Sequence, residues 1–374
     1  MTTWPLARLD ECCQIVSGAT PSTSVREYWG GEIPWATPKD LGELTTATIS
    51  DTPRKLTTAG LAASSATLLP PGSVLFSSRA PIGHVAINTV AMATNQGFKS
   101  FVPLPERIYG PYLYWWLQAN REYLQGLGNG ATFKEVSKAV VSRIEIPLPP
   151  LPEQRRIAAV LDHADAVRAK RRAALTVLDT LTQALYLDMF GDPVRNPKGW
   201  PVKRLGSLVE FLDSRRRPIT SKDRHPGPYP YYGANGVQDY VADFLFDEPL
   251  LLLAEDGGHF DQPSRGIAYR IEGKSWVNNH AHVLRTLPGI GVAFLTAAIR
   301  TRDVHSLLTG STRAKLTKAG ATRLPVAVPP QHAQADFGIK IGRIDAMRSR
   351  LQLSAAALDD LFASLQLRAF RGEL

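Results

Sequence analysis

One long internal repeat limits the folds that this chain can adopt. Residues 130–190 align with residues 310–370 without a gap, at a constant offset of 180 positions, and about a quarter of the aligned positions are identical. A thinner match lies upstream at an offset of 196, where Trp4-Pro5 aligns with Trp200-Pro201. The chain therefore uses one unit twice, a variable segment followed by a better-matched tail. Two copies are too few for a solenoid, which needs at least three to bury a continuous core.

Both tails have the residue spacing of a long helix. Apolar residues recur in alternating steps of four and three along 157–189 and again along 337–369. Pro152 suits a first helical turn, and Gly191 and Gly372 suit helix ends. A helix of about 38 residues spans roughly 57 Å. We therefore expect two long helices that pair as an antiparallel coiled-coil spacer.

Arg168 and Arg348 interrupt the two apolar seams at equivalent positions. A lone polar residue in a seam can fix the register or direction of a helix pair. A long arginine side chain can equally reach out to solvent, and both alternatives stay open. Further apolar residues such as Val160 and Leu361 widen each stripe. These flanks predict an apolar surface that is left for a third partner.

The variable segments combine strand and helix patterns. Short apolar runs at 72–77 and 250–254 are bounded by turn residues and predict strands, whereas 112–117 and 292–299 predict short helices. The aromatic residues of 112–117 are expected in the core. The fold class is therefore α/β or α+β globular segments in tandem, each followed by a long helix, with an internal pseudo-two-fold repeat. The expected division is a first globular segment at 1–150, a central helical spacer at 151–191, a second globular segment at 192–330 and a C-terminal helical spacer at 331–374.

The composition favours a polyanionic partner in a reducing compartment. The 43 Lys and Arg residues exceed the 34 Asp and Glu residues and leave a formal charge of +9, which suits nucleic acid. The only two cysteines, Cys12 and Cys13, are adjacent, a spacing that fits neither an ordinary disulfide nor a zinc site. The N-terminus has no signal-peptide pattern, and no apolar run is long enough to span a bilayer. We expect a cytoplasmic protein without a membrane partner.

Polar clusters in the variable segments can bind double-stranded DNA. Arg suits guanine edges and Asn or Gln suits adenine edges, because each side chain presents two hydrogen-bonding atoms in the plane of the base. Any one of these residues can instead be an ordinary loop residue. The candidate DNA-binding residues are Ser78, Arg79, Asn95, Gln96, Lys99, Thr132, Lys134, Arg215, Arg216, Arg217, Asn235, Asn279, Thr312, Arg313 and Lys315.

The sequence offers few patterns of catalysis. The glycine-rich stretch 126–130 lacks the spacing of a dinucleotide fingerprint, and no Gly-Lys-Ser/Thr phosphate loop occurs. His280 and His282 form no metal signature and are expected to have a structural role. The main enzymatic alternative is a metal-dependent nuclease, because clustered carboxylates can bind Mg²⁺. Its acidic residues would be Asp243, Asp247, Glu248, Glu255 and Asp256, which have no matching cluster in the first copy.

Several motifs together carry a family resemblance over nearly the whole chain. They are the junction Ile146–Ala158, the stretches Ser17–Ser22, Tyr28–Trp35 and Gly72–Gly83, and the triplet Asn95-Gln96-Gly97. On these motifs the chain resembles the DNA-specificity subunit of a type I restriction-modification system. The second copy departs more, because Gln331-His332 replaces the Leu-Pro-Glu step and only Asn279-His280 is similar to the Asn-Gln motif.

The resemblance implies that the segments 1–150 and 192–330 are two target-recognition domains, in tandem, that each read one half of a split DNA site, with the helices setting the gap. It also implies two methyltransferase (modification) subunits, which carry S-adenosylmethionine, and restriction or translocase subunits, which use ATP and Mg²⁺. The chain itself is then expected to be non-catalytic and to hold no cofactor. A stand-alone DNA-binding regulator is the other alternative, and dependence on a methyltransferase partner would distinguish the two.

Overall fold

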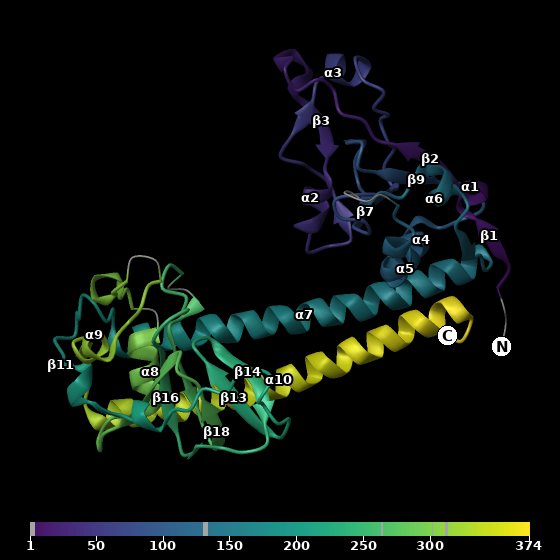
Figure 1. The fold of residues 1–374 in the computed structure, drawn as a ribbon. Coiled ribbons are helices and arrows are strands. Elements are labelled where there is room, and N and C mark those ends of the chain that lie inside the picture. The colour runs from purple at the N-terminus through teal and green to yellow at the C-terminus, as the bar shows by residue number, and fades with distance from the viewer. Residues whose placement is uncertain (1–3, 130–133, 263–264, 301, 311–312) are drawn as a thin grey trace. The chain divides into compact units, whose positions relative to one another are not determined.

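The computed structural model describes residues 4–129, 134–262, 265–300, 302–310 and 313–374. By its internal contacts the chain divides into two units, whose elements are labelled in Figure 1. The first unit comprises Met1–Arg171 and Ser354–Leu374, and the second comprises Arg172–Leu353. Each unit therefore contains one globular segment and a part of each of the two long helices.

The first unit is built on a five-stranded sheet with the strand order β2-β9-β6-β7-β4, accompanied by a three-stranded sheet β5-β3-β8 and the pair β1-β10. The central strand β6 is buried along its whole length, as expected for a short strand that is apolar on both faces. The sequence therefore predicted this strand correctly. The strands are β1 Leu6–Arg8, β2 Cys13–Ser17, β3 Trp29–Ala36, β4 Thr48–Ile49, β5 Lys55–Leu56, β6 Val74–Phe76, β7 Val85–Asn88, β8 Ala93–Thr94, β9 Lys99–Pro103 and β10 Glu145–Pro147.

Short helices connect these strands, and one of them fills the core. Tyr112, Trp115 and Trp116 of α4 are all buried, which confirms that the aromatic run belongs to the core. Ser137 caps α6, because its hydroxyl accepts a hydrogen bond from the Val140 N–H. The helices are α1 Leu9–Cys12, α2 Pro38–Gly42, α3 Thr58–Ala62, α4 Gly110–Ala119, α5 Arg121–Gly126 and α6 Lys138–Ser142.

The second unit repeats this topology with different residues. Its sheet order β12-β19-β16-β17 follows that of β2-β9-β6-β7, and β11 pairs with β20 as β1 pairs with β10. The parallel pair β13 and β18 likewise repeats the parallel pair β3 and β8. The elements are β11 Val202–Arg204, β12 Val209–Phe211, β13 Tyr229–Gly233, β14 Gly236–Val241, β15 Phe246–Asp247, β16 Leu250–Ala254, β17 Ala268–Ile271, β18 Lys274–Val277, β19 Ala281–Thr286, β20 Pro325–Ala327, α8 Val292–Arg300 and α9 Lys318–Thr322.

Two long helices follow the globular segments, α7 at Leu151–Phe190 and α10 at Gln331–Arg371. Both end at a glycine with positive φ, which is +80° at Gly191 and +73° at Gly372. Glycine adopts this conformation without the steric cost that a Cβ would add. The predicted helix ends are therefore confirmed.

A buried glutamine attaches the start of each long helix to its globular segment. The Gln154 amide is fully buried, accepts from the Tyr109 N–H at 2.7 Å and donates to the Pro149 carbonyl at 2.8 Å and the Arg107 carbonyl at 3.1 Å. Gln334 is bonded in the same way, accepting from the Gly291 N–H and donating to a proline carbonyl, both at 2.8 Å. The identity of these two glutamines in the repeat thus has a structural cause.

Within each unit, residues of the two long helices are in contact. In the first unit Arg168 Nε donates to Asp359 Oδ1 at 2.7 Å, and the guanidinium lies 4.1 Å from the centre of the Phe362 ring. In the second unit Arg348 Nη2 lies 3.1 Å from Asp179 Oδ1. Arg348 and Asp179 are the repeat equivalents of Arg168 and Asp359 at the offset of 180. Both arginines therefore make specific ion pairs rather than reaching into open solvent.

Replacing Gln154 with Ala should destabilise the first unit. The substitution leaves the Tyr109 N–H and two carbonyl groups without their buried partner, which should cost about 1–3 kcal/mol for each group that water cannot reach. Urea unfolding followed by tryptophan fluorescence measures this loss. Gln183→Ala, at an exposed position of the same helix, is the matched control, and equal stability of the two variants would contradict the docking role of Gln154.

Candidate nucleic-acid interface

In the first unit, the predicted clusters come together at one group of loops. Ser78 and Arg79 follow β6, and Asn95 and Gln96 form the turn between β8 and β9. Glu135 and Val136, before α6, lie next to Ser78 and Arg79. Ser78 N–H donates to the Gly97 carbonyl at 2.7 Å, and the Ser78 carbonyl accepts from the Val136 N–H at 2.9 Å. Three segments that are distant in sequence are thereby joined through their backbones.

Glu135 pairs with two of the candidate cations and offsets one of their two positive charges. Its carboxylate lies 3.4 Å from Arg79 Nη1 and 3.2 Å from Lys99 Nζ. The Lys99 side chain is only 10% exposed, whereas the Arg79 side chain is 34% exposed. Lys99 therefore holds Glu135 from inside the protein. Arg79 remains accessible to a ligand that competes with Glu135 for it.

The side chains of Ser78 and Asn95 both form hydrogen bonds with Gly97, in the turn between β8 and β9, and do not point away from this turn. Ser78 is fully buried, and its hydroxyl donates to the Gly97 carbonyl at 3.1 Å. The Asn95 side-chain oxygen accepts from the Gly97 N–H at 2.9 Å. Gln96, between these anchors, is exposed, and Lys134 is exposed on the neighbouring loop. Burial of Ser78 argues against its direct contact with a base.

The second unit builds the same loop framework. The Glu255 N–H donates to the His280 carbonyl at 2.9 Å, and the Glu255 carbonyl accepts from the Leu316 N–H at 2.7 Å. The Asn278 side-chain oxygen accepts from the His280 N–H at 2.8 Å. Asn278 therefore stands where Asn95 stands in the first unit, and Asn279 stands where Gln96 stands. The expected correspondence of Asn279-His280 with Asn95-Gln96 was wrong by one residue.

The signs of the charges in this framework are exchanged between the units. The bridge between Arg79 and Glu135 in the first unit corresponds to the bridge between Asp256 and Lys315 in the second. Asp256 accepts from Arg313 at 2.8 Å. Lys315 Nζ lies 2.9 Å from a Glu255 oxygen. The same backbone thus supports two different charge patterns.

The three consecutive arginines of the second unit have three different environments. Arg215 donates to the Leu245 carbonyl at 3.0 Å and lies 3.5 Å from Glu248. The Arg216 side chain is only 14% exposed, and its Nη1 donates to Glu255 at 2.5 Å and to the Ala281 carbonyl at 2.8 Å. Arg217 is exposed. Asn235 is also exposed and donates to the Gly257 carbonyl at 2.9 Å, while Thr132 and Thr312 lie outside the described residues.

Arg216 belongs to a buried network of charges with Asp213, Glu255 and His282. His282 Nε2 lies 2.8 Å from the Leu316 carbonyl, which can only accept, and its Nδ1 lies 2.6 Å from Asp213 Oδ2. Burial raises the pKa of Asp213 and of Glu255, but hydrogen bonds and positive charges from their partners outweigh it, so both pKa values lie below their ordinary values. The network therefore stabilises the fold at neutral pH, and this contribution is lost as the pH falls through the lowered values.

Three of the acidic residues of the nuclease alternative, Glu248, Glu255 and Asp256, are paired with arginine or lysine side chains. Asp213, Glu255 and His282 have potential ligand atoms within 4.8 Å of one another, but the Arg216 guanidinium already supplies a positive charge there. Glu248 accepts two hydrogen bonds from Arg285, both at 2.7 Å. His282 is buried, in agreement with the structural role expected for it.

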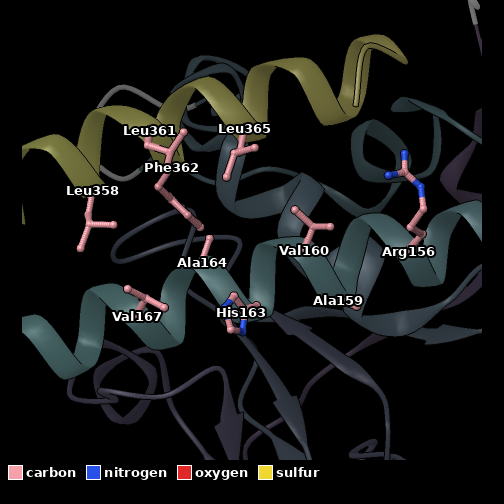
Figure 2. A pocket seen from close by; sticks show the side chains of 10 residues that line it. All are labelled: Arg156, Ala159, Val160, His163, Ala164, Val167, Leu358, Leu361, Phe362 and Leu365. Carbon is pink, nitrogen blue, oxygen red and sulfur yellow. The ribbon is translucent and has the colours of Figure 1, made fainter.

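A second surface lies on the long helices within the first unit. Apolar side chains of α7 and α10 line a groove of about 500 Å³. Figure 2 shows Leu358, Phe362 and Leu365 pointing toward α7, and Val160 and Ala164 pointing toward α10. Leu361 lines this groove and is 52% exposed. The expected apolar flank is therefore present.

Comparison with known proteins identifies the family of this chain. The family model described as the type I restriction modification DNA specificity domain matches residues 1–176 and 197–350. The chain belongs to this family. The chain is 34% identical over 232 residues to the type I restriction enzyme MjaIX specificity subunit of Methanocaldococcus jannaschii. The match covers 58% of this chain and 54% of the relative. The matched region thus spans about half the length of that relative.

Two further matches, one in sequence and one in structure, cover nearly the whole chain. The type I restriction enzyme EcoprrI specificity subunit of Escherichia coli is 23% identical over 362 residues, which cover 92% of this chain and 88% of that one. The crystal structure of the type I restriction-modification S subunit from M. genitalium matches with a TM-score of 0.62 at 15% identity, covering 98% of this chain and 96% of that one. The structural match shows that this chain shares the fold of that S subunit over nearly its whole length. No described helix has the length and hydropathy to cross a membrane.

The contrast between Arg216 and Arg217 yields a matched pair of variants. Arg216→Ala should lower the free energy of unfolding by about 1.5–3 kcal/mol, because it removes a charged hydrogen-bond donor from the buried Glu255 and leaves Lys315 as the cation bonded there. Arg217→Ala should leave the stability unchanged but weaken DNA binding and reduce the salt dependence of binding by about one counterion. Chemical denaturation and DNA titrations at several salt concentrations measure both effects. Equal behaviour of the two variants would refute this assignment.

Proposed function

We propose that this chain is the non-catalytic specificity subunit of a type I restriction-modification complex and binds double-stranded DNA at a two-part site. The observation that carries the proposal is the loop framework that both units share. Its backbone hydrogen bonds are equivalent, whereas its exposed side chains and its charges differ. Such a framework suits two readers of different half-sites, and membership of the specificity-domain family supports it.

The DNA-facing surface consists, in this proposal, of the exposed candidates, while their buried neighbours hold the loops. Ser78, Lys99 and Arg216 belong to the supporting group because they are buried and bonded within the protein. The surface group contains the exposed residues Gln96, Lys134, Arg215, Arg217, Asn235, Asn279 and Arg313. It also contains Arg79 and Lys315, whose side chains are 34% and 44% exposed. Exposed cations of this kind contact phosphates, and exposed amides contact bases.

The long helices act, in this proposal, as an antiparallel coiled-coil spacer that sets the unread gap. The reciprocal ion pairs Arg168–Asp359 and Arg348–Asp179 support it, because repeat-equivalent residues exchange roles. Arginines paired in this way fix the register and direction of two helices. The segments 1–150 and 192–330 remain the proposed recognition domains.

The apolar flanks of the helices are the proposed docking surfaces for two methyltransferase subunits. The groove of the first unit contains Val167 and Leu361. Their repeat equivalents in the second unit are Met347 and Leu181, which are 55% and 43% exposed. Two equivalent faces on one chain suit two copies of the same partner. S-adenosylmethionine, and the ATP and Mg²⁺ used by restriction subunits, would be bound by these cytoplasmic partners.

A domain exchange tests the reading function. Replacing residues 1–150 with the corresponding segment of another specificity subunit should change one half of the methylated sequence and leave the other half intact. Sequencing of methylated adenines in cells that express the complex measures both halves at once. If both halves changed together, the two units would not be independent readers.

Charge substitution tests the docking surfaces. Leu361→Glu and Leu181→Glu should each reduce the complex from two methyltransferase subunits to one, and the double variant should bind none, because an unpaired carboxylate is costly to bury at an apolar interface. The mass of the purified complex measures the stoichiometry. Leu353→Glu is the control, since Leu353 is 74% exposed and does not line the groove. Two bound subunits in the double variant would exclude these surfaces.

A further inference from the structure

Each unit presents one exposed carboxamide at the same position of the same turn. In the first unit this residue is Gln96, which follows Asn95 between β8 and β9. In the second it is Asn279, which follows Asn278 directly before β19. Both side chains are exposed, although the asparagine before each of them is engaged with its own turn. The sequence repeat does not reveal this equivalence, because the offset here is neither 180 nor 196.

Backbone hydrogen bonds fix both turns in the same way. The Asn95 N–H donates to the Ala36 carbonyl at 3.0 Å, and the Asn278 N–H donates to the Tyr232 carbonyl, also at 3.0 Å. Ala36 and Tyr232 are themselves equivalent at the upstream offset of 196. The carboxamides are thus carried on a rigid support, which direct reading of a base requires.

A local contact orients the Gln96 carboxamide, and another holds the backbone of Asn279. The Thr20 hydroxyl donates to the Gln96 side-chain oxygen. Gly18 brings this segment close to the turn, because a Cβ at Gly18 would lie only 2.0 Å from the Asn95 carbonyl oxygen. In the second unit the Arg216 guanidinium lies 3.4 Å from the Asn279 carbonyl oxygen and steadies the backbone instead. The Gln96 amide nitrogen keeps its donors and its oxygen keeps a second lone pair.

The cations around both turns are paired with carboxylates of the protein. Glu135 pairs with both Arg79 and Lys99 in the first unit. In the second unit, Arg313 pairs with Asp256, and Lys315 pairs with Glu255. A cation that binds a phosphate in place of the counterions of DNA must therefore compete with a carboxylate that already holds it. A planar amide needs no net charge, since it accepts from N6 and donates to N7 of adenine.

We propose that Gln96 and Asn279 are the equivalent base-reading residues of the two units and that each contacts an adenine edge in its own half-site. The inference rests on the proposed function and adds the reading position and the class of base. The surrounding cations hold the loops and approach the backbone of the DNA.

The test uses the chain in complex with its methyltransferase subunits and a pool of randomised DNA duplexes. The sequences retained by the wild-type complex define the two half-sites. Gln96→Glu should lower the preference for adenine at one position of one half-site by about 5- to 150-fold, because a carboxylate cannot donate to N7. Asn279→Asp should have the same effect on one position of the other half-site. Gln96→Ala should relax the same position as Gln96→Glu, which separates loss of the contact from repulsion by the new charge.

Gln14→Glu is the matched control. Gln14 is exposed on β2 of the same unit, and its strand partner is Val102. This variant should retain the wild-type sequences, and the melting temperatures of all variants should agree. A wild-type complex that retains no two-part sequence would overturn the proposed function. A two-part wild-type sequence that persists unchanged in Gln96→Glu and Asn279→Asp would overturn the assignment of these readers and leave the proposed function standing.

Discussion

The attachment of each long helix to its globular segment depends on one buried amide. Gln154 and Gln334 satisfy backbone groups on the loop that precedes α4 or α8 and on the proline pair that precedes the helix. An amide is suited to this position because it donates and accepts at once, and buried backbone groups need partners of both kinds. The direction of each helix relative to its own segment follows from these bonds. The loop framework of each unit is thereby attached to the start of the long helix that follows it.

Features with a local cause could be predicted from the sequence. The long helices, their glycine ends and the buried aromatic helix α4 followed from periodicity and from single residues, and the structure confirms them. The strand order could not be predicted, because it depends on pairings between distant and dissimilar segments. The repeated topology of the globular parts is therefore visible only in the structure. The correspondence of the Asn95 turn was wrong by one residue because the intervening loops differ in length.

The candidate site was predicted as a set of residue types, without its partners. Gln96, Arg217 and Asn279 are exposed as a DNA contact requires. Ser78 and Arg216 have the same polar character but are engaged inside the protein. The difference comes from Gly97 and Glu255, which are distant in sequence, and no local pattern shows that they are close. Clusters of polar residues in the sequence thus predict the region of the candidate site. The burial of each side chain is needed to tell the residues that hold the loops from those that are exposed on them.

The exchanged charges of the two loop frameworks have a consequence for how such chains can recombine. A crossover between the two copies inside the globular repeat would place Arg79 opposite the equivalent of Glu135, which is Lys315, and two like charges would then face each other. A crossover within the long helices would preserve the two ion pairs between the helices, because Arg168 and Asp179 have identical equivalents in Arg348 and Asp359. Recombination within the helices would therefore be tolerated better than recombination within the globular segments. It would exchange whole globular segments between chains.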